Sequence, residues 1–469
     1  MTLAALVEAL GADGVLTGAD CERYARDWAG NRRAMPAMVL RPRDVAGVSA
    51  ALRIAAGAGL AVVPQGGNTG VCAGALPGAG MAVLSLERLA GLDIDPRART
   101  ARAGAGVTLQ AVQEAAAAHG LAFPVEIGAR GSATIGGVLA TNAGGFNVLR
   151  HGNARALCLG LRAVLAGGQV VDLMTALAKD NTGYDLRDLL IGSEGTLAVI
   201  TDAVLRLVPA PRVRATAFAA FRDGQAALDF LARAEAETGG LIEAFELLPA
   251  RAVALIRRHF PQLPAPLARP ADWGVLVELA SAAGRDAAPW PDGRPALAGL
   301  LESLLAEALA SGAVSDAALP QSEAQRLALW RLREASLEAT TREGRWIRFD
   351  IALPRVAVPA FLEQVEAALR RQWPGIRTNH LGHLGDGNLH YSVMPDPAGW
   401  DAALTARIEA VVLDLVAAHG GSFAAEHGIG RAKPHLLARR KDPGALAAMR
   451  AIKAALDPAG ILNPGAVLG

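Results

Sequence analysis

The densest group of residues that could do chemistry lies in "HLGHLGDGNLHYSV", from His380 to Val393, which holds three of the nine histidines. An Asp-Gly pair at 386–387 separates two short apolar runs and predicts a two-residue type I′ hairpin, which needs positive φ at both central residues. This hairpin places His383 directly opposite His390, with Cβ atoms about 4.5–5.5 Å apart, and His380 on the other face. The two imidazoles could bind one metal ion. The alternative is a histidine pair that only packs a sheet.

A third ligand for such an ion is offered by the stretch "AAEHGIG", where Glu426 precedes His427. Two histidines and a carboxylate leave an open coordination position on zinc or a similar ion, as a catalytic metal site requires. Neighbouring residues of an extended strand point in opposite directions, so Glu426 and His427 can serve one site only if the backbone turns there. Gly428 permits that turn.

Three glycine-rich segments could bring the backbone close to a ligand: "VVPQGGNTGVCAG", "EIGARGSATIGGVLATNAGG" and "GYDLRDLLIGSEGTLAVIT". Glycines carry no Cβ and allow positive φ, so successive N–H groups can converge on a phosphate. The alternative for any one of them is a loop that merely turns the chain. The sequence has no Walker A loop and no G-x-G-x-x-G between a strand and a helix, which disfavours P-loop and Rossmann nucleotide folds.

The elements that must position these residues predict an α+β protein. From about residue 36 to residue 208, short runs such as "LAVVPQ" and "MAVLSL" read as strands, and "VTLQAVQEAAAAHG" reads as a helix. They mix without a regular βαβ order. Pro209 and Pro211 mark a boundary, after which long helical stretches such as "LAGLLESLLAEALASG" and strand-like pieces such as "WGVLVELA" predict a second α+β domain.

Composition limits the classes of function. The 469 residues carry a formal net charge of +1, so the composition does not indicate the positive electrostatic field that attracts nucleic acid. Three widely spaced cysteines argue against a disulfide framework and favour a reducing cytoplasm. The N-terminus reads as a short amphipathic helix instead of a signal peptide, and no apolar run is long enough to span a membrane.

Five motifs in the order "PQGGNTG", "GARGSATIGGVLATNAGG", "GSEGTLAVIT", "HLGDGNLH" and "EHGIGRAK" resemble those of the FAD-dependent D-2-hydroxy acid dehydrogenases. These belong to the vanillyl-alcohol oxidase / p-cresol methylhydroxylase (PCMH) superfamily, and the resemblance runs from about residue 34 to the C-terminus. It implies a two-domain α+β fold: a PCMH-type FAD-binding domain over 1–211, a substrate (cap) domain over 212–425 and a helical segment over 426–469 that returns to the FAD domain.

By the same resemblance, the glycine-rich segments hold the pyrophosphate, isoalloxazine and adenine parts of FAD. The first loop lacks the histidine that attaches the flavin covalently in some relatives, so we expect non-covalent FAD. The residues expected to bind the cofactor are Pro64, Gly66, Gly67, Asn68, Thr69, Gly70, Gly128, Ser132, Thr134, Gly137, Asn142, Gly145, Glu194, Gly195, Ile200 and Asn463.

The resemblance also implies roles for the histidine hairpin and its partner motif. In metal-dependent relatives the residues that match His383, His390 and Glu426 hold a divalent metal, here expected to be zinc. The residue that matches His427 is the base that removes the proton of the 2-hydroxyl group. The C2 hydrogen then leaves as hydride to flavin N5, which converts the D-2-hydroxy acid to the 2-oxo acid.

Arginines of the second domain match the family's substrate-binding positions. Arg333, in "WRLRE", matches the residue that grips a carboxylate, and Arg348 stands where 2-hydroxyglutarate enzymes often carry a lysine. Leu337 and Ser392 stand where those enzymes carry a threonine and an asparagine. D-lactate and D-2-hydroxy acids with an aliphatic tail therefore stand beside D-2-hydroxyglutarate as candidate substrates.

The expected partners are a small 2-hydroxy acid and an electron acceptor, either another protein or a quinone, without nucleic acid, and a homodimer is a candidate assembly. Two alternatives come from other classes of function. In a metal-dependent hydrolase, the histidine–glutamate site would activate water and the purified protein would be colourless. A non-catalytic flavin subunit of a larger oxidase would be yellow, yet no 2-hydroxy acid would bleach it.

Overall fold

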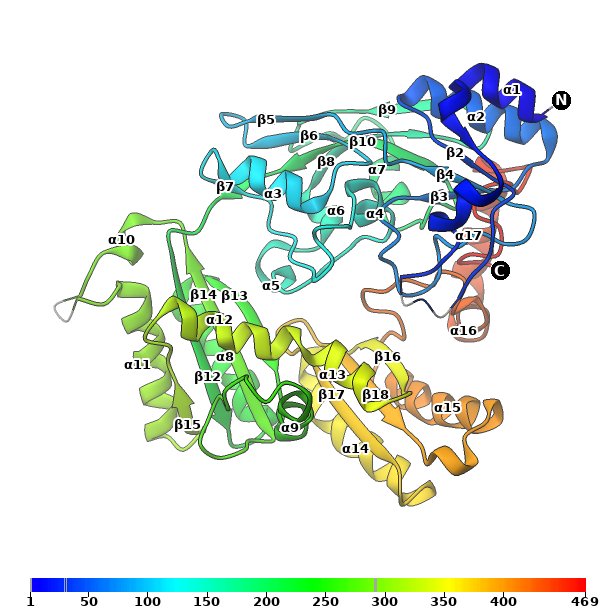
Figure 1. Ribbon diagram of the computed structural model, residues 1–469. Helices are drawn as coiled ribbons and strands as arrows, with labels where there is room; N and C mark the ends of the chain where they lie inside the picture. Colours follow the sequence, from blue (N-terminus) through cyan, green and yellow to red (C-terminus); the bar gives the residue numbers. More distant parts are fainter. Residues whose placement is uncertain (1, 29, 31, 291–292) are drawn as a thin grey trace. The chain divides into compact units, whose positions relative to one another are not determined.

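The computed structural model describes residues 2–28, 30, 32–290 and 293–469, which form two compact units (Figure 1). The first unit comprises Met1–Gly145, His151–Ala210 and Glu426–Gly469, so the C-terminal segment belongs with the N-terminal part of the chain. The second unit comprises Phe146–Arg150 and Pro211–Ala425. Each unit mixes strands and helices, which confirms the predicted α+β class.

The described residues of the first unit form three sheets, in the strand orders β1-β2-β4-β3, β5-β6-β10-β8-β9 and β11-β7. In the first of them β2, β4 and β3 run parallel, whereas the five-stranded sheet is antiparallel throughout. The strands are β1 (Val15–Leu16), β2 (Met38–Leu40), β3 (Val62–Gln65), β4 (Ala82–Ser85), β5 (Leu92–Asp95), β6 (Thr100–Gly104), β7 (Leu121–Ala122), β8 (Cys158–Val164), β9 (Val170–Leu173), β10 (Val199–Arg206) and β11 (Val208–Pro209).

Helix α2 of the first unit begins and ends at residues that complete its terminal hydrogen bonds. In α2 the Asp44 side chain accepts a bond from the Gly47 amide at the N-terminus, and Gly59 ends the helix with φ +63°. The helices are α1 (Thr2–Leu10), η1 (Ala12–Gly14), η2 (Gly18–Tyr24), α2 (Val45–Ala58), α3 (Leu109–Ala117), α4 (Ile135–Ala140), α6 (Ala154–Leu157), α7 (Leu186–Leu190), α16 (Pro434–Arg440) and α17 (Pro443–Leu456). Helix α5 (Val148–His151) spans the boundary between the units.

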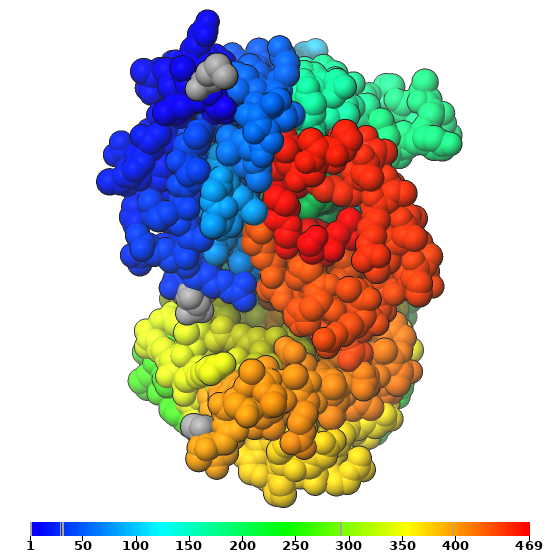
Figure 2. All heavy atoms as spheres, turned by 90° about the vertical axis from the view of Figure 1, so that its right-hand side faces the viewer, coloured from blue at the N-terminus to red at the C-terminus, as the bar shows by residue number. Residues whose placement is uncertain are grey.

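The C-terminal segment is built into the core of the first unit. Leu462 is fully buried in the same hydrophobic cluster as Leu40, Leu84 and Val62. It also forms a parallel bridge with Val62, so the segment continues the edge of the sheet at β3. Figure 2 shows the red C-terminal residues lying against the blue N-terminal residues of the same unit.

The second unit is built on one antiparallel sheet of seven strands in the order β15-β12-β14-β13-β17-β18-β16. Its strands are β12 (Val213–Phe221), β13 (Ile242–Leu247), β14 (Trp273–Ser281), β15 (Val314–Ala318), β16 (Ile347–Ala352), β17 (Arg377–His383) and β18 (Asn388–Met394). Its helices are α8 (Gly224–Thr238), α9 (Ala250–His259), α10 (Gly284–Ala287), α11 (Ala296–Ala310), α12 (Glu323–Glu334), α13 (Ser336–Glu343), η3 (Arg355–Ala357), α14 (Val358–Gln372), η4 (Pro397–Gly399) and α15 (Ala402–Ala418).

The two faces of this sheet differ in chemistry because successive side chains of a strand point to opposite sides. Phe245 and Tyr391 point to one face and contact Phe230 of α8 and Phe361 of α14. The opposite face, here called the polar face, carries charged and polar side chains from β12, β14, β13, β17, β18 and β16. The strand registers thus place the charged and polar side chains that could bind a ligand on one side of the sheet.

Among the residues that the structure describes, no helix combines the length and the apolar character needed to cross a membrane.

Candidate functional site

A pocket in the first unit collects the glycine-rich segments. Its lining includes eleven of the residues expected to bind a cofactor: Pro64, Gly66, Gly67, Asn68, Thr69, Gly70, Thr134, Gly137, Glu194, Gly195 and Ile200. His427, expected to be the base, lines the same pocket. The sequence analysis did not single out Cys72, Gly74 and Val138, which also line it. Three loops that are distant in the sequence therefore share one cavity with the "EHGIG" segment.

The loop after β3 requires glycine because two backbone segments meet there. A Cβ on Gly67 would lie 1.8 Å from the Ser132 carbonyl oxygen, and one on Gly66 would lie 2.4 Å from Thr134 Oγ1. Asn68 follows with φ +52°, in the left-handed region that asparagine tolerates better than most residues. The glycines thus let the first loop lie directly on the second.

A buried hydroxyl in this pocket is suited to hold a cofactor. Thr134 is 7% exposed, and within the described part of the chain its Oγ1 has no hydrogen-bond partner. Buried polar atoms are nearly always satisfied, so an atom of this kind on a pocket wall indicates a polar ligand. The residues present therefore fit a polar cofactor.

Five residues expected to bind the cofactor lie outside the pocket lining: Gly128, Ser132, Asn142, Gly145 and Asn463. Asn463 is buried, and its Nδ2 donates to the carbonyl oxygens of Gly74 and Glu194, both lining residues. Asn142 Oδ1 accepts from the Arg155 amide. These two asparagines support the loops that form the wall.

Glu194 lines the pocket, but its carboxylate binds backbone amides of the segment that follows His427. Its two oxygens accept hydrogen bonds from the amides of Ile429 and Gly430, both at 2.8 Å. Burial raises the pKa of this carboxyl group, although the two N–H groups oppose the rise. A Cβ on Gly428, which has φ +71°, would lie 2.7 Å from Glu194 Oε1. Glu194 therefore fixes the turn that brings His427 to the pocket wall.

The histidine hairpin is present in the second unit, but its predicted register is wrong. His383 pairs with Asn388 and Leu381 with His390, so four residues, Leu384–Gly387, connect β17 and β18. Gly387 has φ +83° while Asp386 does not have positive φ, so the turn is not type I′. A Cβ on Gly387 would lie 2.0 Å from the Leu353 carbonyl oxygen. Packing against the chain after β16 thus selects a longer loop.

The two histidines nevertheless share the polar face, because the register differs from the predicted one by two residues and the side-chain period is two. Their ring centroids are 5.4 Å apart, and a ring nitrogen of each lies within 4.8 Å of the other. His380 lies on the opposite face, stacked on Tyr391. His383 and His390 are thus neighbours on a diagonal instead of a direct pair.

The buried carboxylate of Glu246 fixes the orientation of His383. Glu246 is 1% exposed, and its two oxygens bind His383 Nδ1 at 2.7 Å and Arg333 Nε at 2.8 Å. Burial by itself would raise the pKa of Glu246, but His383 and Arg333 outweigh it and the pKa lies below its ordinary value. With the proton on Nδ1, Nε2 is the nitrogen through which His383 would bind a metal ion.

A second acidic residue lies beside His390. Asp350 is 4% exposed, and its Oδ1 lies 3.7 Å from His390 Nδ1 and accepts a bond from Asn388 Nδ2 at 3.0 Å. His390 belongs to groups that could hold a metal ion, with Asp350 in one and His383 in another. The polar face thus offers a possible metal site of imidazole and carboxylate ligands.

Comparisons with known proteins agree with this architecture. Residues 210–467 match the model of the FAD linked oxidases, C-terminal domain, and residues 36–174 match that of an FAD binding domain. The chain belongs to the FAD-linked oxidases. The resemblance inferred from the five motifs is thereby confirmed, as are FAD as the cofactor, the assignment as an FAD-dependent enzyme and the two-domain PCMH-like fold.

This FAD-linked oxidase is similar over nearly its full length to curated relatives. It is 38% identical to a D-2-hydroxyglutarate dehydrogenase of Xanthomonas citri pv. viticola, over 95% of this chain and 92% of the relative. It is 38% identical to the mitochondrial D-2-hydroxyglutarate dehydrogenase of Bos taurus, over 93% and 78%. Among solved structures, p-cresol methylhydroxylase with substrate bound shares the fold, with a TM-score of 0.74, 15% identity and coverage of 100% and 96%.

In this FAD-linked oxidase, the two expected substrate arginines differ in environment. Arg333 is 5% exposed and, of the described residues, none supplies a hydrogen-bond partner for its Nη2. Arg348 is exposed on β16 and donates to Thr341 Oγ1 at 2.8 Å. Its cross-strand partner is Ser392, and Leu337 is 46% exposed on α13. Arg333 is thus pre-oriented, whereas Arg348 lies at the exposed end of the polar face.

The sequence analysis missed Glu246 and Asp350, although each left a signal. Both are acidic residues inside apolar strands, in "IEAFEL" and "IRFDIA". A charge in a buried strand position requires a partner, because its desolvation would otherwise cost on the order of several kcal/mol. Such residues mark the sheet positions that face the site.

Proposed function

We propose that the protein oxidises a D-2-hydroxy acid to the 2-oxo acid by hydride transfer to FAD. One observation carries the proposal: the Glu246 carboxylate binds both His383 and Arg333. A potential metal ligand and a guanidinium are thereby held side by side on one face of the sheet. A 2-hydroxy acid presents a hydroxyl group and a carboxylate on neighbouring carbons, which such a pair of groups would bind together.

We propose that His383, His390 and Glu426 hold a divalent cation, preferably zinc. Glu426 directly follows Ala425, whose amide donates to the Asp350 carbonyl at 3.3 Å, and Asp350 pairs with His390 across β16 and β18. One peptide bond thus separates Glu426 from a residue tied to the histidine strands. When bound, the cation would lower the pKa of the substrate hydroxyl.

Arg333 would bind the substrate carboxylate, for which its buried Nη2 is available as a donor. His427 would take the hydroxyl proton on a ring nitrogen as the C2 hydride departs, because an imidazole nitrogen can act as a general base. The position of His427 in the wall of the glycine-lined pocket supports this role. FAD, when bound there non-covalently, supplies the hydride acceptor.

The substrate's far end is proposed to reach Arg348. The names of the relatives favour D-2-hydroxyglutarate, and Thr341, bonded to Arg348, offers a hydroxyl one helical turn beyond Leu337. Leu337 and Ser392 favour an acid with a shorter or aliphatic tail.

We further propose a cytoplasmic location, in keeping with three free cysteines, and an electron acceptor that is a protein or a quinone.

One experiment tests the proposal. The purified protein is mixed without oxygen with D- and L-forms of 2-hydroxyglutarate, lactate and longer 2-hydroxy acids, and the flavin absorption is followed. We expect bleaching by one or more D-acids, slowed after chelation and restored by zinc. A yellow protein that no acid bleaches would contradict the proposal and favour a non-catalytic flavin subunit.

A further inference from the structure

Helix α12 carries three residues whose side chains are held on the polar face of the sheet. Arg326, Trp330 and Arg333 follow one another at spacings of four and three, which places them on one side of the helix. Arg333 binds Glu246 of β13, whereas Arg326 and Trp330 bind a different glutamate, Glu278 of β14. The helix is therefore fixed to two neighbouring strands through two buried carboxylates.

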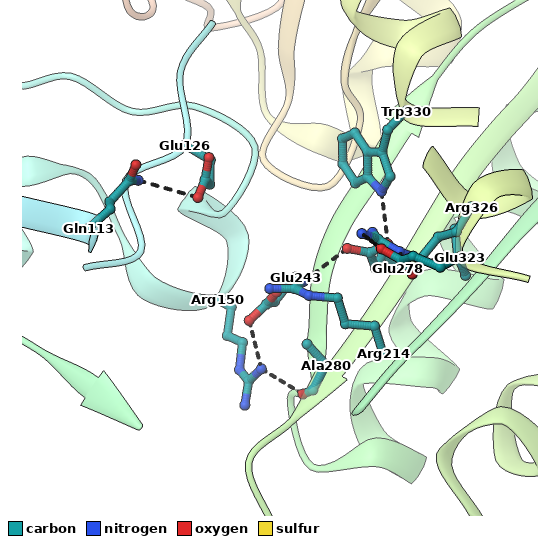
Figure 3. Close-up of polar contacts among 11 residues, drawn as sticks. Gln113, Glu126, Arg150, Arg214, Glu243, Glu278, Ala280, Glu323, Arg326 and Trp330 are labelled. Atoms are coloured by element: carbon teal, nitrogen blue, oxygen red, sulfur yellow. Dashed lines mark hydrogen bonds and ion pairs between the residues drawn. The ribbon is translucent and has the colours of Figure 1, made fainter. Parts of the chain in front are cut away.

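Glu278 is the more heavily bonded of these carboxylates. It is 3% exposed, and its Oε2 accepts from Arg326 Nη1 and Trp330 Nε1, both at 2.8 Å, and from Thr216 Oγ1 at 2.6 Å. Its Oε1 accepts from Arg214 Nη1 at 2.9 Å. Figure 3 shows Arg214, Arg326 and Trp330 converging on it. Charge-assisted bonds of this kind are short and directional, so they define where the helix lies.

Aromatic contacts extend this constraint toward Arg333. The Trp330 ring packs edge-on against Phe146, with centroids 5.2 Å apart. The Arg333 guanidinium lies over the same Phe146 ring, 5.1 Å from its centroid, and His383 contacts that ring at 5.4 Å. A shift of Trp330 would therefore move Phe146, and with it the surroundings of Arg333 and His383. These are the groups that the proposed function assigns to the substrate and the metal.

We infer that Glu278 is a positioning residue for substrate binding, acting through α12 and Trp330 on the orientation of Arg333. The inference rests on the proposed function, in which Arg333 grips the substrate carboxylate. The carboxylate keeps its charge as the hydride leaves C2, so the grip is nearly equal in the ground state and the transition state. Its loss therefore raises KM and leaves kcat nearly unchanged.

The test compares Glu278→Gln with a matched control, Glu243→Gln. Glu243 is also 3% exposed and binds two arginines, Arg150 and Arg214. In the holoenzyme, with D-2-hydroxyglutarate and D-lactate as probes and a dye as electron acceptor, we expect Glu278→Gln to raise KM about tenfold with kcat within about twofold. The dissociation constant of each acid, measured by calorimetry, should rise by a similar factor to KM. Glu243→Gln should keep KM within about twofold of the wild type.

A double-mutant cycle identifies the route. In an Arg333→Lys background, Glu278→Gln should change KM by less than about twofold, because Arg333 is the group through which it acts. Trp330→Phe, which removes the indole N–H donor and leaves a smaller aromatic ring to pack on Phe146, should raise KM about threefold and show the same dependence on Arg333. This variant carries the test if Glu278→Gln does not fold.

The outcomes separate this inference from the proposed function. A wild-type enzyme that neither binds nor oxidises any of the D-2-hydroxy acids, the longer ones included, would overturn both. Wild-type turnover combined with an unchanged KM in Glu278→Gln and Trp330→Phe would overturn this inference alone. So would a KM effect of Glu278→Gln that persists in full when Arg333 is lysine, since Glu278 would then act by another route.

Discussion

At the scale of single residues, the candidate site depends on carboxylates that would touch no substrate. Glu246 lies 137 residues before His383 and 87 before Arg333, and it binds both. Buried charges are tolerated when they are paired and hydrogen-bonded, and each partner here depends on the other two. Removing the negative charge would leave a guanidinium buried without compensation.

Glu246→Gln should therefore lower both stability and metal affinity. Loss of one partner of a buried ion pair costs about 3–5 kcal/mol, and loss of a carboxylate behind a metal-binding histidine weakens metal binding by about 10–100-fold. Denaturant unfolding measures the first effect and metal content after dialysis measures the second. Glu323→Gln, at a 67% exposed side chain paired with Arg326, is the control and should change little. A fully stable Glu246→Gln with normal metal content would refute the assigned role.

His427→Ala should retain FAD but reduce it slowly. General bases contribute about 10²–10⁴-fold to rate, so we expect flavin reduction by a D-2-hydroxy acid to slow by at least about a hundredfold. Stopped-flow absorption of the bound flavin measures this rate. His435→Ala, at an exposed histidine of α16, is the matched control. Unchanged reduction in His427→Ala would remove this residue from the role of base.

At the scale of elements, the β17–β18 hairpin separates what is local from what is not. The alternation of side chains along a strand assigns His383 and His390 to one face and His380 to the other in either register. The choice of register instead follows the contact of Gly387 with the Leu353 carbonyl, which belongs to a distant segment. The prediction that His383 and His390 share a face is therefore confirmed, whereas the predicted direct pairing of the two is wrong.

His380, on the face of the sheet opposite the site, should make the free energy of unfolding fall as the pH is lowered. Burial lowers the pKa of His380 to about 3, with the Arg251 cation adding to the effect and Glu366 opposing it. The unfolded chain takes up this proton below its ordinary pKa of 6.5, whereas the folded chain does not until near pH 3. The stability present above pH 6.5 is thus lost as the pH falls, by up to about 1.4 kcal/mol per pH unit.

His380→Phe keeps a ring stacked on Tyr391 and removes the titrating nitrogens. We expect the free energy of unfolding of this variant to fall less steeply between pH 6.5 and 4.5 than that of the wild type, by about one proton's contribution. Urea unfolding at several pH values measures the slope. Identical slopes in the two proteins would mean that His380 takes up its proton in the folded state.

At the scale of the whole chain, the C-terminal segment belongs to the unit that holds the glycine-lined pocket. Arg431 donates to the carbonyl oxygens of Leu76 and Pro464, at 2.8 and 2.7 Å, and to Asn463 Oδ1 at 2.9 Å. One guanidinium thus ties the C-terminal segment to the loop that follows "PQGGNTG". Burial lowers the pKa of Arg431.

Arg431→Lys should weaken FAD retention. A lysine keeps the charge but lacks the planar fork that serves three acceptors at once, so at least one of them loses its donor. Loss of one charge-assisted bond, about 1.5–3 kcal/mol, predicts a rise of tenfold or more in the FAD dissociation constant if the loop loosens. The ratio of flavin to protein absorption after gel filtration measures it. Arg439→Lys, an exposed arginine of α16, is the control, and equal retention in both would contradict the prediction.

The sequence by itself determined the family, the α+β class and twelve of the residues that line the pocket, His427 among them. Those features are written locally: glycines mark where backbones meet at Gly66 and Gly67, and strand alternation marks which histidines share a face. Motifs of this kind are legible because the chemistry needs particular residue types next to one another in the chain.

The tertiary structure alone decided which groups hold the site residues in place. Glu246 behind His383, Glu278 beneath α12 and Glu194 on the amides of residues 429 and 430 are long-range pairings. Nothing in the local sequence specifies them, because a buried glutamate takes its partners from whatever strands and helices packing brings within hydrogen-bond distance.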